Sequence, residues 1–280
     1  MLCVHGFLKK YRSEYVAKFL GERTMNLNDF LLVKVFKKSK YMEDFNNGNI
    51  YLNSTSYFWN LENTFQQDKE GAIFQQKGRG FLFKGNDAFL NILWKSSTVD
   101  DVIKYTKEEN VGQLICETTE FSFRLNGYLC CFYLLPKKDV SFTGNIFSII
   151  TEDAKKDITI FLEKYLNESE NHDFYATIYD AEQFCNIFTN GMRNKGYQTI
   201  YGKVNYKDID EAAKILLYQK GDLQSILFTK PIIYNYQKEF RILLNKPSEE
   251  TKGHISENII GIEKSIYGSF CYDCIKNKKV

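Results

Sequence analysis

The run from Leu129 to Leu135 constrains the fold of this chain more than any other segment. Its residues are apolar nearly throughout, which is typical of a strand that lies inside a sheet and is covered on both faces. The residues from Ser122 to Arg124 also favour a strand, and Asn126-Gly127 favours a tight turn between the two. We therefore expect Ser122–Arg124 and Tyr128–Leu135 to pair as neighbouring strands in a central sheet.

The spacing of apolar residues and the capping residues predict further elements. Strands are expected at 30–36, 49–53, 174–179, 198–206 and 239–244, with a hairpin at 72–84 that turns at Gly78-Arg79-Gly80. Helices are expected at 8–21, at 39–45 with Ser39 as its cap, at 152–166, after Asp180 with Gln183, and after Asp208 with Glu211. This mixture lacks the regular alternation of a doubly wound fold. The predicted class is α+β, a mixed, mostly antiparallel central sheet with flanking helices. No linker or repeat divides residues 1–280, so one domain is expected.

The composition favours a folded, intracellular protein. Of the 280 residues, 44% are hydrophobic and 16% aromatic, and the net charge of +2 gives no general attraction to nucleic acid or anionic membranes. The seven cysteines are odd in number and scattered through apolar runs, which is typical of reduced thiols in a cytoplasm. No basic leader precedes the apolar start, and no stretch approaches the roughly 18 apolar residues of a membrane span. A cytoplasmic location without a membrane partner is expected.

The sequence lacks the residue patterns of several common metal, catalytic and phosphate-binding sites. Cys271 and Cys274 have the spacing of a zinc knuckle, but no second pair of Cys or His accompanies them, so a strand with two half-buried thiols is expected and no metal site. No nucleophile elbow, phosphate-binding loop or dinucleotide fingerprint occurs. The basic stretches are short and flank apolar elements, and no recognition motif supports a nucleic-acid surface.

Glu239 stands out because it lies in the predicted strand 239–244, and buried strands rarely carry a carboxylate without a partner. Two interpretations follow. Gln237 and Glu239 share a face of an extended chain, so an amide and a carboxylate could lie over a pocket as catalytic groups. Alternatively, Glu239 and Arg241 form a pair on an edge strand that faces water.

Three short segments then occur in order along the chain. Lys34 lies inside the first predicted strand, Ser54, Ser56, Tyr57 and Phe58 follow the second, and Gln237 with Glu239 opens the late strand. This order resembles the arginine-serine-glutamate class of the ADP-ribosyltransferase superfamily. The resemblance implies a fold of that type, NAD as cofactor and a macromolecular acceptor. It also implies that Glu239 is catalytic, that Gln237 orients the acceptor, that Lys34, Ser54 and Ser56 hold NAD, and that Tyr57 or Phe58 stacks on nicotinamide.

A second resemblance covers more of the chain. The segment from Asn47 to Leu52, the turn from Asp68 to Gly71 and the stretch Lys230-x-x-x-Tyr234-x-x-x-x-Glu239-Phe-Arg-Ile look like uncharacterised prokaryotic proteins of phage and defence-island contexts. This implies a role in phage–host conflict, such as antiviral defence or a toxin. The first hypothesis is an effector that transfers ADP-ribose from NAD to a macromolecule. The second is a non-catalytic module, an immunity sensor or inhibitor, that binds a protein partner. A third is a nuclease built on Asp68 and Glu70.

Overall fold

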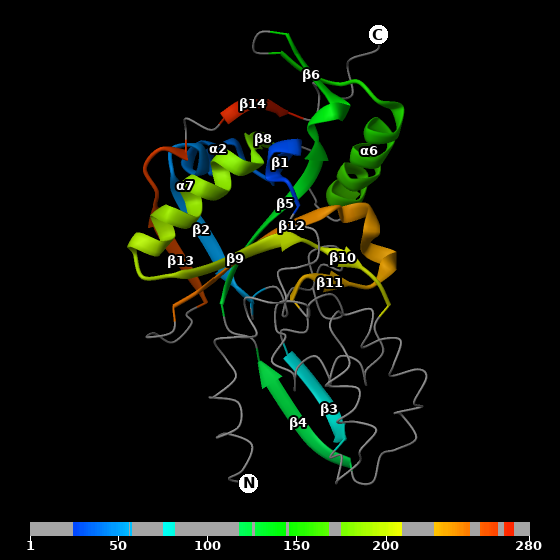
Figure 1. The fold of residues 1–280 in the computed structure, drawn as a ribbon, viewed down its shortest axis with the longest axis vertical. Helices are drawn as coiled ribbons and strands as arrows, with labels where there is room; N and C mark the ends of the chain where they lie inside the picture. Colours follow the sequence, from blue (N-terminus) through cyan, green and yellow to red (C-terminus); the bar gives the residue numbers. More distant parts are fainter. Residues whose placement is uncertain are drawn as a thin grey trace.

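The computed structural model of the chain describes residues 25–55, 57, 75–81, 118–124, 127–143, 146–167, 175–208, 227–246, 253–262 and 266–271. Over these residues the fold is α+β, as predicted, with helices beside a curled and mostly antiparallel sheet (Figure 1). Its helices and 3-10 turns are η2 (Leu27–Asp29), α2 (Ser39–Asn46), η4 (Lys137–Asp139), α6 (Glu152–Asn167), α7 (Ala181–Asn194) and η5 (Ile232–Gln237). Its strands are β1 (Phe30–Phe36), β2 (Asn49–Ser54), β3 (Gln75–Phe81), β4 (Thr118–Arg124), β5 (Tyr128–Pro136), β6 (Val140–Thr143), β7 (Ile146–Ile149), β8 (Tyr175–Asp180), β9 (Gln198–Lys203), β10 (Asn205–Tyr206), β11 (Thr229–Lys230), β12 (Glu239–Asn245), β13 (His254–Asn258) and β14 (Ile266–Cys271).

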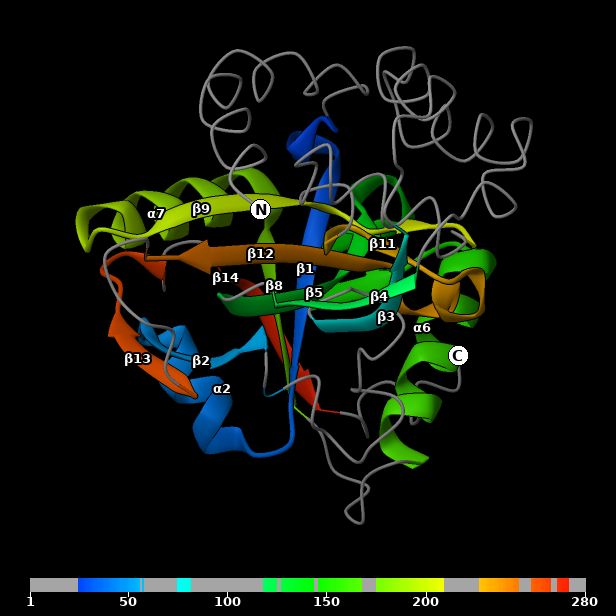
Figure 2. The ribbon, with the colours of Figure 1, turned by 90° about the horizontal axis from the view of Figure 1, so that it is seen from below.

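Over the described residues the main sheet has eight strands, and β5 is its central member. The order β13-β2-β5-β1-β8-β14 forms one path, and β12 joins it by pairing with both β5 and β9. Residues 128–133 of β5 pair with β12 along one edge, and Figure 2 shows β12 between β5 and β9. The apolar run of β5 is buried between strands and helices, which confirms the prediction of a central strand.

The other edge of β5 is shared by two strands. β1 pairs with residues 133–136 of β5, and β2 pairs with residues 128–129 of β5. On this edge, neither of these two strands pairs with residues 130–132 of β5. The sheet therefore forks at Cys130–Phe132, and α2 connects the two arms along the chain. At the fork, Lys34 Nζ donates a hydrogen bond to the Cys131 carbonyl oxygen at 2.9 Å. This contact supplies the donor that a neighbouring strand would otherwise provide.

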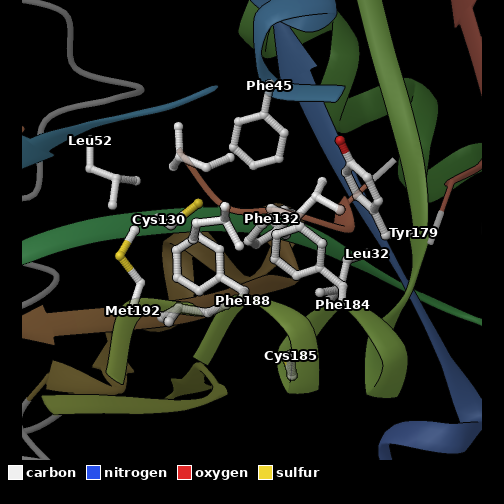
Figure 3. Packing of buried hydrophobic residues seen from close by; sticks show 14 of the residues in the cluster. Leu32, Phe45, Leu52, Cys130, Phe132, Tyr179, Phe184, Cys185, Phe188 and Met192 are labelled. Carbon is white, nitrogen blue, oxygen red and sulfur yellow. The ribbon is translucent and has the colours of Figure 1, made fainter. Parts of the chain in front are cut away.

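One face of the sheet is covered by α2 and α7 and holds the larger core. Asp180 caps α7 by accepting a hydrogen bond from the Gln183 backbone N–H at 2.9 Å, as the capping-box pattern predicted. The helix buries residues on one side at helical spacing, and these pack on alternate residues of β1, β5 and β12. Figure 3 shows the aromatic centre of this cluster, whose labelled members are Leu32, Phe45, Leu52, Cys130, Phe132, Tyr179, Phe184, Cys185, Phe188 and Met192.

The second face is covered in part by α6. Ala154, Ile158 and Leu162 lie one turn apart and are nearly inaccessible to solvent, as expected for an amphipathic helix at 152–166. They pack with the remaining alternate residues of β1, β5 and β8, among them Val33 and Tyr133. Among the described helices, none combines the length and the apolar character that a bilayer crossing requires.

Several local predictions were wrong. Gly78-Arg79-Gly80 does not form a turn but lies inside β3, which pairs with β4. As a consequence β4 and β5 are both strands but do not pair with each other. Lys38, not Ser39, is the N-cap residue of α2, and it makes no side-chain capping bond. The helices expected at 8–21 and after Asp208 lie outside the described residues.

Candidate functional site

Gln237 and Glu239 come together at the junction between η5 and β12. The residue between them, Lys238, adopts a left-handed conformation with φ of 40° and ψ of 48°. This conformation is uncommon for a residue with a side chain. Its carbonyl oxygen accepts a hydrogen bond from the Leu134 backbone N–H at 2.8 Å, which ties the junction to β5. The turn at Lys238 brings the Gln237 amide and the Glu239 carboxylate to the same side chain, Lys230.

The carboxylate of Glu239 is engaged on both oxygens. Arg241 approaches it with Nε 2.7 Å from Oε1 and Nη2 3.2 Å from Oε2, a forked arrangement that suits guanidinium and carboxylate. Lys230 Nζ lies 2.7 Å from Glu239 Oε2 and donates to Gln237 Oε1 at 2.7 Å. Arg241 also donates from Nη1 to the carbonyl oxygen of Leu227 at 2.7 Å. We call Lys230, Gln237, Glu239 and Arg241 the buried ion cluster.

All four side chains of the buried ion cluster are inside the protein. The exposed fraction is 1% for Arg241, 7% for Glu239 and 6% for both Lys230 and Gln237. β12 is an interior strand, so the predicted Glu–Arg pair exists but does not lie on an edge strand facing water. Removing charges from water is unfavourable unless partners compensate it, and here the partners are in place.

The electrostatics follow from this packing. Burial alone would raise the pKa of Glu239, but the charges of Arg241 and Lys230 outweigh burial and hold the pKa below its usual range. Glu239 is therefore ionised at neutral pH. The neighbouring thiol behaves in the opposite way, because burial and the negative charge of Glu239 raise the pKa of Cys131 well above its usual value. Cys131 is thus a neutral thiol and a poor nucleophile.

The structure places Lys34 and Glu239 on opposite faces of the sheet. Lys34 Nζ lies 5.2 Å from the centre of the Phe132 ring and 6.0 Å from that of Phe45, on the face covered by α2 and α7. Glu239 is opposite Tyr133 and alternates with Phe240, which faces the same core as Phe132. Because successive residues of a strand point to opposite faces, the sheet separates Lys34 from Glu239.

Ser54 lies on the face of the sheet that holds Lys34 and not on that of Glu239. Ser54 is buried, shares the face of Ile50 and Leu52 toward the larger core, and accepts a hydrogen bond from the Tyr57 backbone N–H at 3.3 Å. Tyr57 is 44% exposed. Ser56 and Phe58 lie outside the described residues.

Of the residues predicted to bind NAD, Lys34 and Ser54 do not share a face of the sheet with Glu239. A single NAD molecule would have to contact Lys34 and Ser54 on one face and Glu239 on the other, through the intervening strands. Gln237 and Glu239 are also occupied by Lys230 and Arg241. The catalytic role of Glu239 and Gln237 and the binding roles of Lys34, Ser54, Ser56 and Tyr57 stay predictions.

The described residues hold no group of three or more His, Cys, Asp or Glu side chains that could bind a metal ion. Cys271 is the last residue of β14, and Cys274, the other cysteine of the expected strand, lies outside the described residues. Asp68 and Glu70, the basis of the nuclease hypothesis, also lie outside them.

Lys230 is the member of the buried ion cluster that was not singled out as a site residue. The stretch that resembles the phage and defence-island proteins nevertheless contains it, with Tyr234, Glu239 and Arg241 at fixed spacings. In the structure these residues converge, and Lys230 Nζ also lies 5.8 Å from the centre of the Tyr234 ring. The spacing of that stretch was thus the available signal. No family model, curated protein or solved structure matches this chain.

Proposed function

We propose that this chain is a non-catalytic protein-binding module that acts in phage–host conflict. The observation that carries the proposal is that Arg241 and Lys230 bind both carboxylate oxygens of Glu239 inside the protein. A catalytic carboxylate must reach its substrate, whereas one with two buried cationic partners connects structural elements. The phage–host context rests on the resemblance to proteins of defence islands.

The elements that the buried ion cluster connects all meet at η5. Lys230 precedes this turn and Gln237 ends it, and their side chains bond to each other across it. On the outside, Lys164 of α6 lies over the Tyr236 ring at 3.6 Å, and Lys238 pairs with Asp157 of the same helix. The turn is therefore fixed from both sides.

This fixed turn presents two apolar side chains to solvent. Ile232 is 55% exposed and Ile233 is 65% exposed. The backbone N–H of Ile232 donates to Asp208 Oδ1 at 3.2 Å, which adds a further attachment. Adjacent apolar residues on a rigid support lose little conformational entropy when a partner covers them. This is the arrangement expected of a binding anchor at the centre of a protein interface.

The test is a phage plating assay on cells that express the wild-type chain or single variants. The wild-type chain is expected to change plating efficiency, and Ile233→Asp is expected to weaken that change, because a carboxylate replaces the apolar side chain that the partner would cover. Ile150→Asp is the matched control, because Ile150 is 53% exposed but follows β7, outside η5. It should behave as wild type. Melting temperatures of both variants should equal that of wild type.

Two results would contradict the proposal. A wild-type chain that leaves plating of a broad phage panel unchanged would remove the phage–host context. Equal behaviour of Ile233→Asp and Ile150→Asp would remove η5 as the binding anchor.

NAD-dependent transfer of ADP-ribose to a macromolecule is the second candidate. The observation in its favour is that Gln237 and Glu239 converge and that the carboxylate is ionised at neutral pH. The test is incubation of the protein with labelled NAD and cell lysate, beside Glu239→Gln. Label transfer or nicotinamide release that is lost in a Glu239→Gln protein with an unchanged melting temperature would establish this candidate over the binding module.

A further inference from the structure

Cys131 has no strand partner on the edge of β5 that faces the fork. The Leu134 N–H donates to the Lys238 carbonyl, so the even-numbered residues of β5 bond toward β12 and the odd-numbered ones toward β1 and β2. Neither β1 nor β2 pairs with Cys131, although the register would place Val35 of β1 opposite it. The backbone N–H and C=O of Cys131 therefore point into the fork.

Lys34 replaces only one of the two groups that a neighbouring strand would supply. In an antiparallel pair, the opposite residue donates its N–H to one carbonyl and accepts one N–H with its own carbonyl. Lys34 Nζ supplies the donor, at 2.9 Å from the Cys131 carbonyl oxygen. An ammonium group has no lone pair with which to accept a hydrogen bond, so the Cys131 N–H still requires an acceptor.

The charge of Lys34 has no counterpart among the described residues. Other lysines that are not fully exposed, Lys137, Lys230 and Lys238, each pair with a carboxylate. No carboxylate of a described residue lies within ion-pair distance of Lys34. Its further neighbours are the Cys130 thiol, with Sγ 3.8 Å from Nζ, and the rings of Phe45 and Phe132. A half-buried cation is stabilised by an anionic partner, and this one has neutral neighbours.

We propose that the fork binds a carboxylate, with one oxygen accepting the Cys131 N–H and the other accepting a second N–H of Lys34. The two donors lie close together, because Nζ is bound to the carbonyl oxygen of the same residue that offers the N–H. A carboxylate supplies both an acceptor for the backbone and a negative charge for the ammonium, and such charge-assisted hydrogen bonds are the strong ones. Its single charge balances the single charge of Lys34.

The fork reaches solvent at the Lys34 end. Lys34 and Val35 are half-buried, whereas the preceding residues Leu32 and Val33 are buried. One cation flanked by two aromatic rings suits a singly charged acid better than a polyanion, which would bring several negative charges into apolar surroundings. The carboxylate belongs either to a small free acid or to an acidic side chain of a protein partner, and the test distinguishes these sources.

The test is an NMR titration of the full chain, isotopically labelled at the cysteine nitrogens. The seven cysteines give a small set of amide signals, and a Cys131→Ala sample identifies the signal of Cys131. Sodium formate is the probe, and sodium chloride of equal ionic strength is the control. Formate is expected to move the Cys131 amide proton downfield until the site is saturated, with a Kd in the millimolar range because the contact is small. Chloride should not, and the Cys185 signal in α7 should stay in place.

Two variants and a second probe sharpen the result. Lys34→Met should weaken formate binding at least about tenfold, because it removes a charged donor whose hydrogen bond contributes roughly that factor. Lys156→Met is the matched control, because Lys156 is exposed on α6, and it should bind formate as wild type does. Aspartate with both ends blocked is the second probe. If it binds more tightly than formate, the ligand is an acidic side chain, and if it does not, the ligand is a small free acid.

A Cys131 signal that formate leaves in place would overturn the proposal, since water would then be the acceptor in the fork. Formate binding that Lys34→Met retains in full would overturn it too. The first of these results comes from the wild-type chain, so it does not depend on the folding of a variant. The fork is independent of the η5 anchor, so each proposal can fail alone.

Discussion

Replacing Glu239 with Gln should destabilise the protein strongly. The substitution keeps the shape of the side chain and one acceptor oxygen, but it removes the charge between Arg241 and Lys230. These two cations are 1% and 6% exposed, so water does not compensate the loss. Breaking a buried ion pair by removing one partner costs about 3–5 kcal/mol. We expect Glu239→Gln to lower the free energy of unfolding by about that amount. The melting temperature should fall by roughly 10 °C, at about 2–4 °C per kcal/mol for a chain of this size.

The measurement is urea unfolding of wild type and variant, followed by tryptophan fluorescence and circular dichroism. Glu152→Gln is the matched control, because Glu152 forms an ion pair with Lys155 at 2.6 Å but its side chain is 85% exposed. Exposed pairs of this kind contribute between about 0 and 1 kcal/mol. The control should therefore unfold at nearly the wild-type urea concentration.

A result in which Glu239→Gln and Glu152→Gln lose equally little stability would refute the reasoning. It would mean that Arg241 and Lys230 do not need the carboxylate in the folded state, and that Glu239 is available for another role. The same two variants therefore distinguish a structural carboxylate from a catalytic one before any substrate is known.

Three further predictions concern pH, the fork in the sheet and the start of β2. Since the folded-state pKa of Glu239 lies below its unfolded value of about 4.3, its stabilisation is present above that pH and is lost as the pH falls further; the difference in urea midpoint between wild type and Glu239→Gln should be largest at neutral pH and shrink in acid. Lys34→Met should lower the free energy of unfolding by about 1.5–3 kcal/mol, because the Cys131 carbonyl at the fork loses a charged donor; an unchanged urea midpoint would exclude that role. Gly48→Ala should unfold at a clearly lower temperature, because φ is +80° and the new Cβ would lie 2.2 Å from the Ile259 carbonyl oxygen; wild-type melting would show that this turn relaxes freely.

The elements with a strong local signal were predictable from the sequence. The strand at 30–36 and the start of α7 at Asp180 match the structure because each depends on residues close together in the chain. The end of α2 is similar, since Gly48 has the positive φ that glycine favours after a helix. These features need no information about distant segments.

Strand pairing was less predictable, because it depends on distant segments. Asn126-Gly127 has the composition of a hairpin turn, yet β4 pairs with β3 and β5 pairs with three other strands. A turn signal favours a local connection, but burial of the apolar run in β5 requires neighbours along both of its edges. Burying β5 stabilises the fold more than a local hairpin would, and the long-range pairing therefore overrides the turn preference.

The sequence indicated Gln237 and Glu239 as residues of the candidate site, but it did not indicate that Lys230 binds both of them. The closeness of Gln237 and Glu239 followed from their spacing, although the structure achieves it through the left-handed Lys238 and not through an extended strand. Lys230 lies on another strand, β11. Its distance from Glu239 in space cannot be derived from the spacing of apolar residues or from secondary-structure propensity. Only the fixed spacing of the stretch from Lys230 to Ile242 indicated that these residues act together.

The separation of Lys34 from Glu239, by contrast, is implied by the alternation of apolar residues. In β1, Lys34 shares a face with Leu32 and Phe36, and in β12 the residues on that same core are Phe240, Ile242 and Leu244. A shift of β12 by one residue would bring Glu239 to the face of Lys34, but it would also move all three of those apolar side chains out of the larger core and carry Arg241 into it. Arg241 would then be a charge inside an apolar cluster, which is unfavourable without partners. The hydrophobic pattern that makes β12 an interior strand is therefore also what keeps its carboxylate away from the lysine of β1.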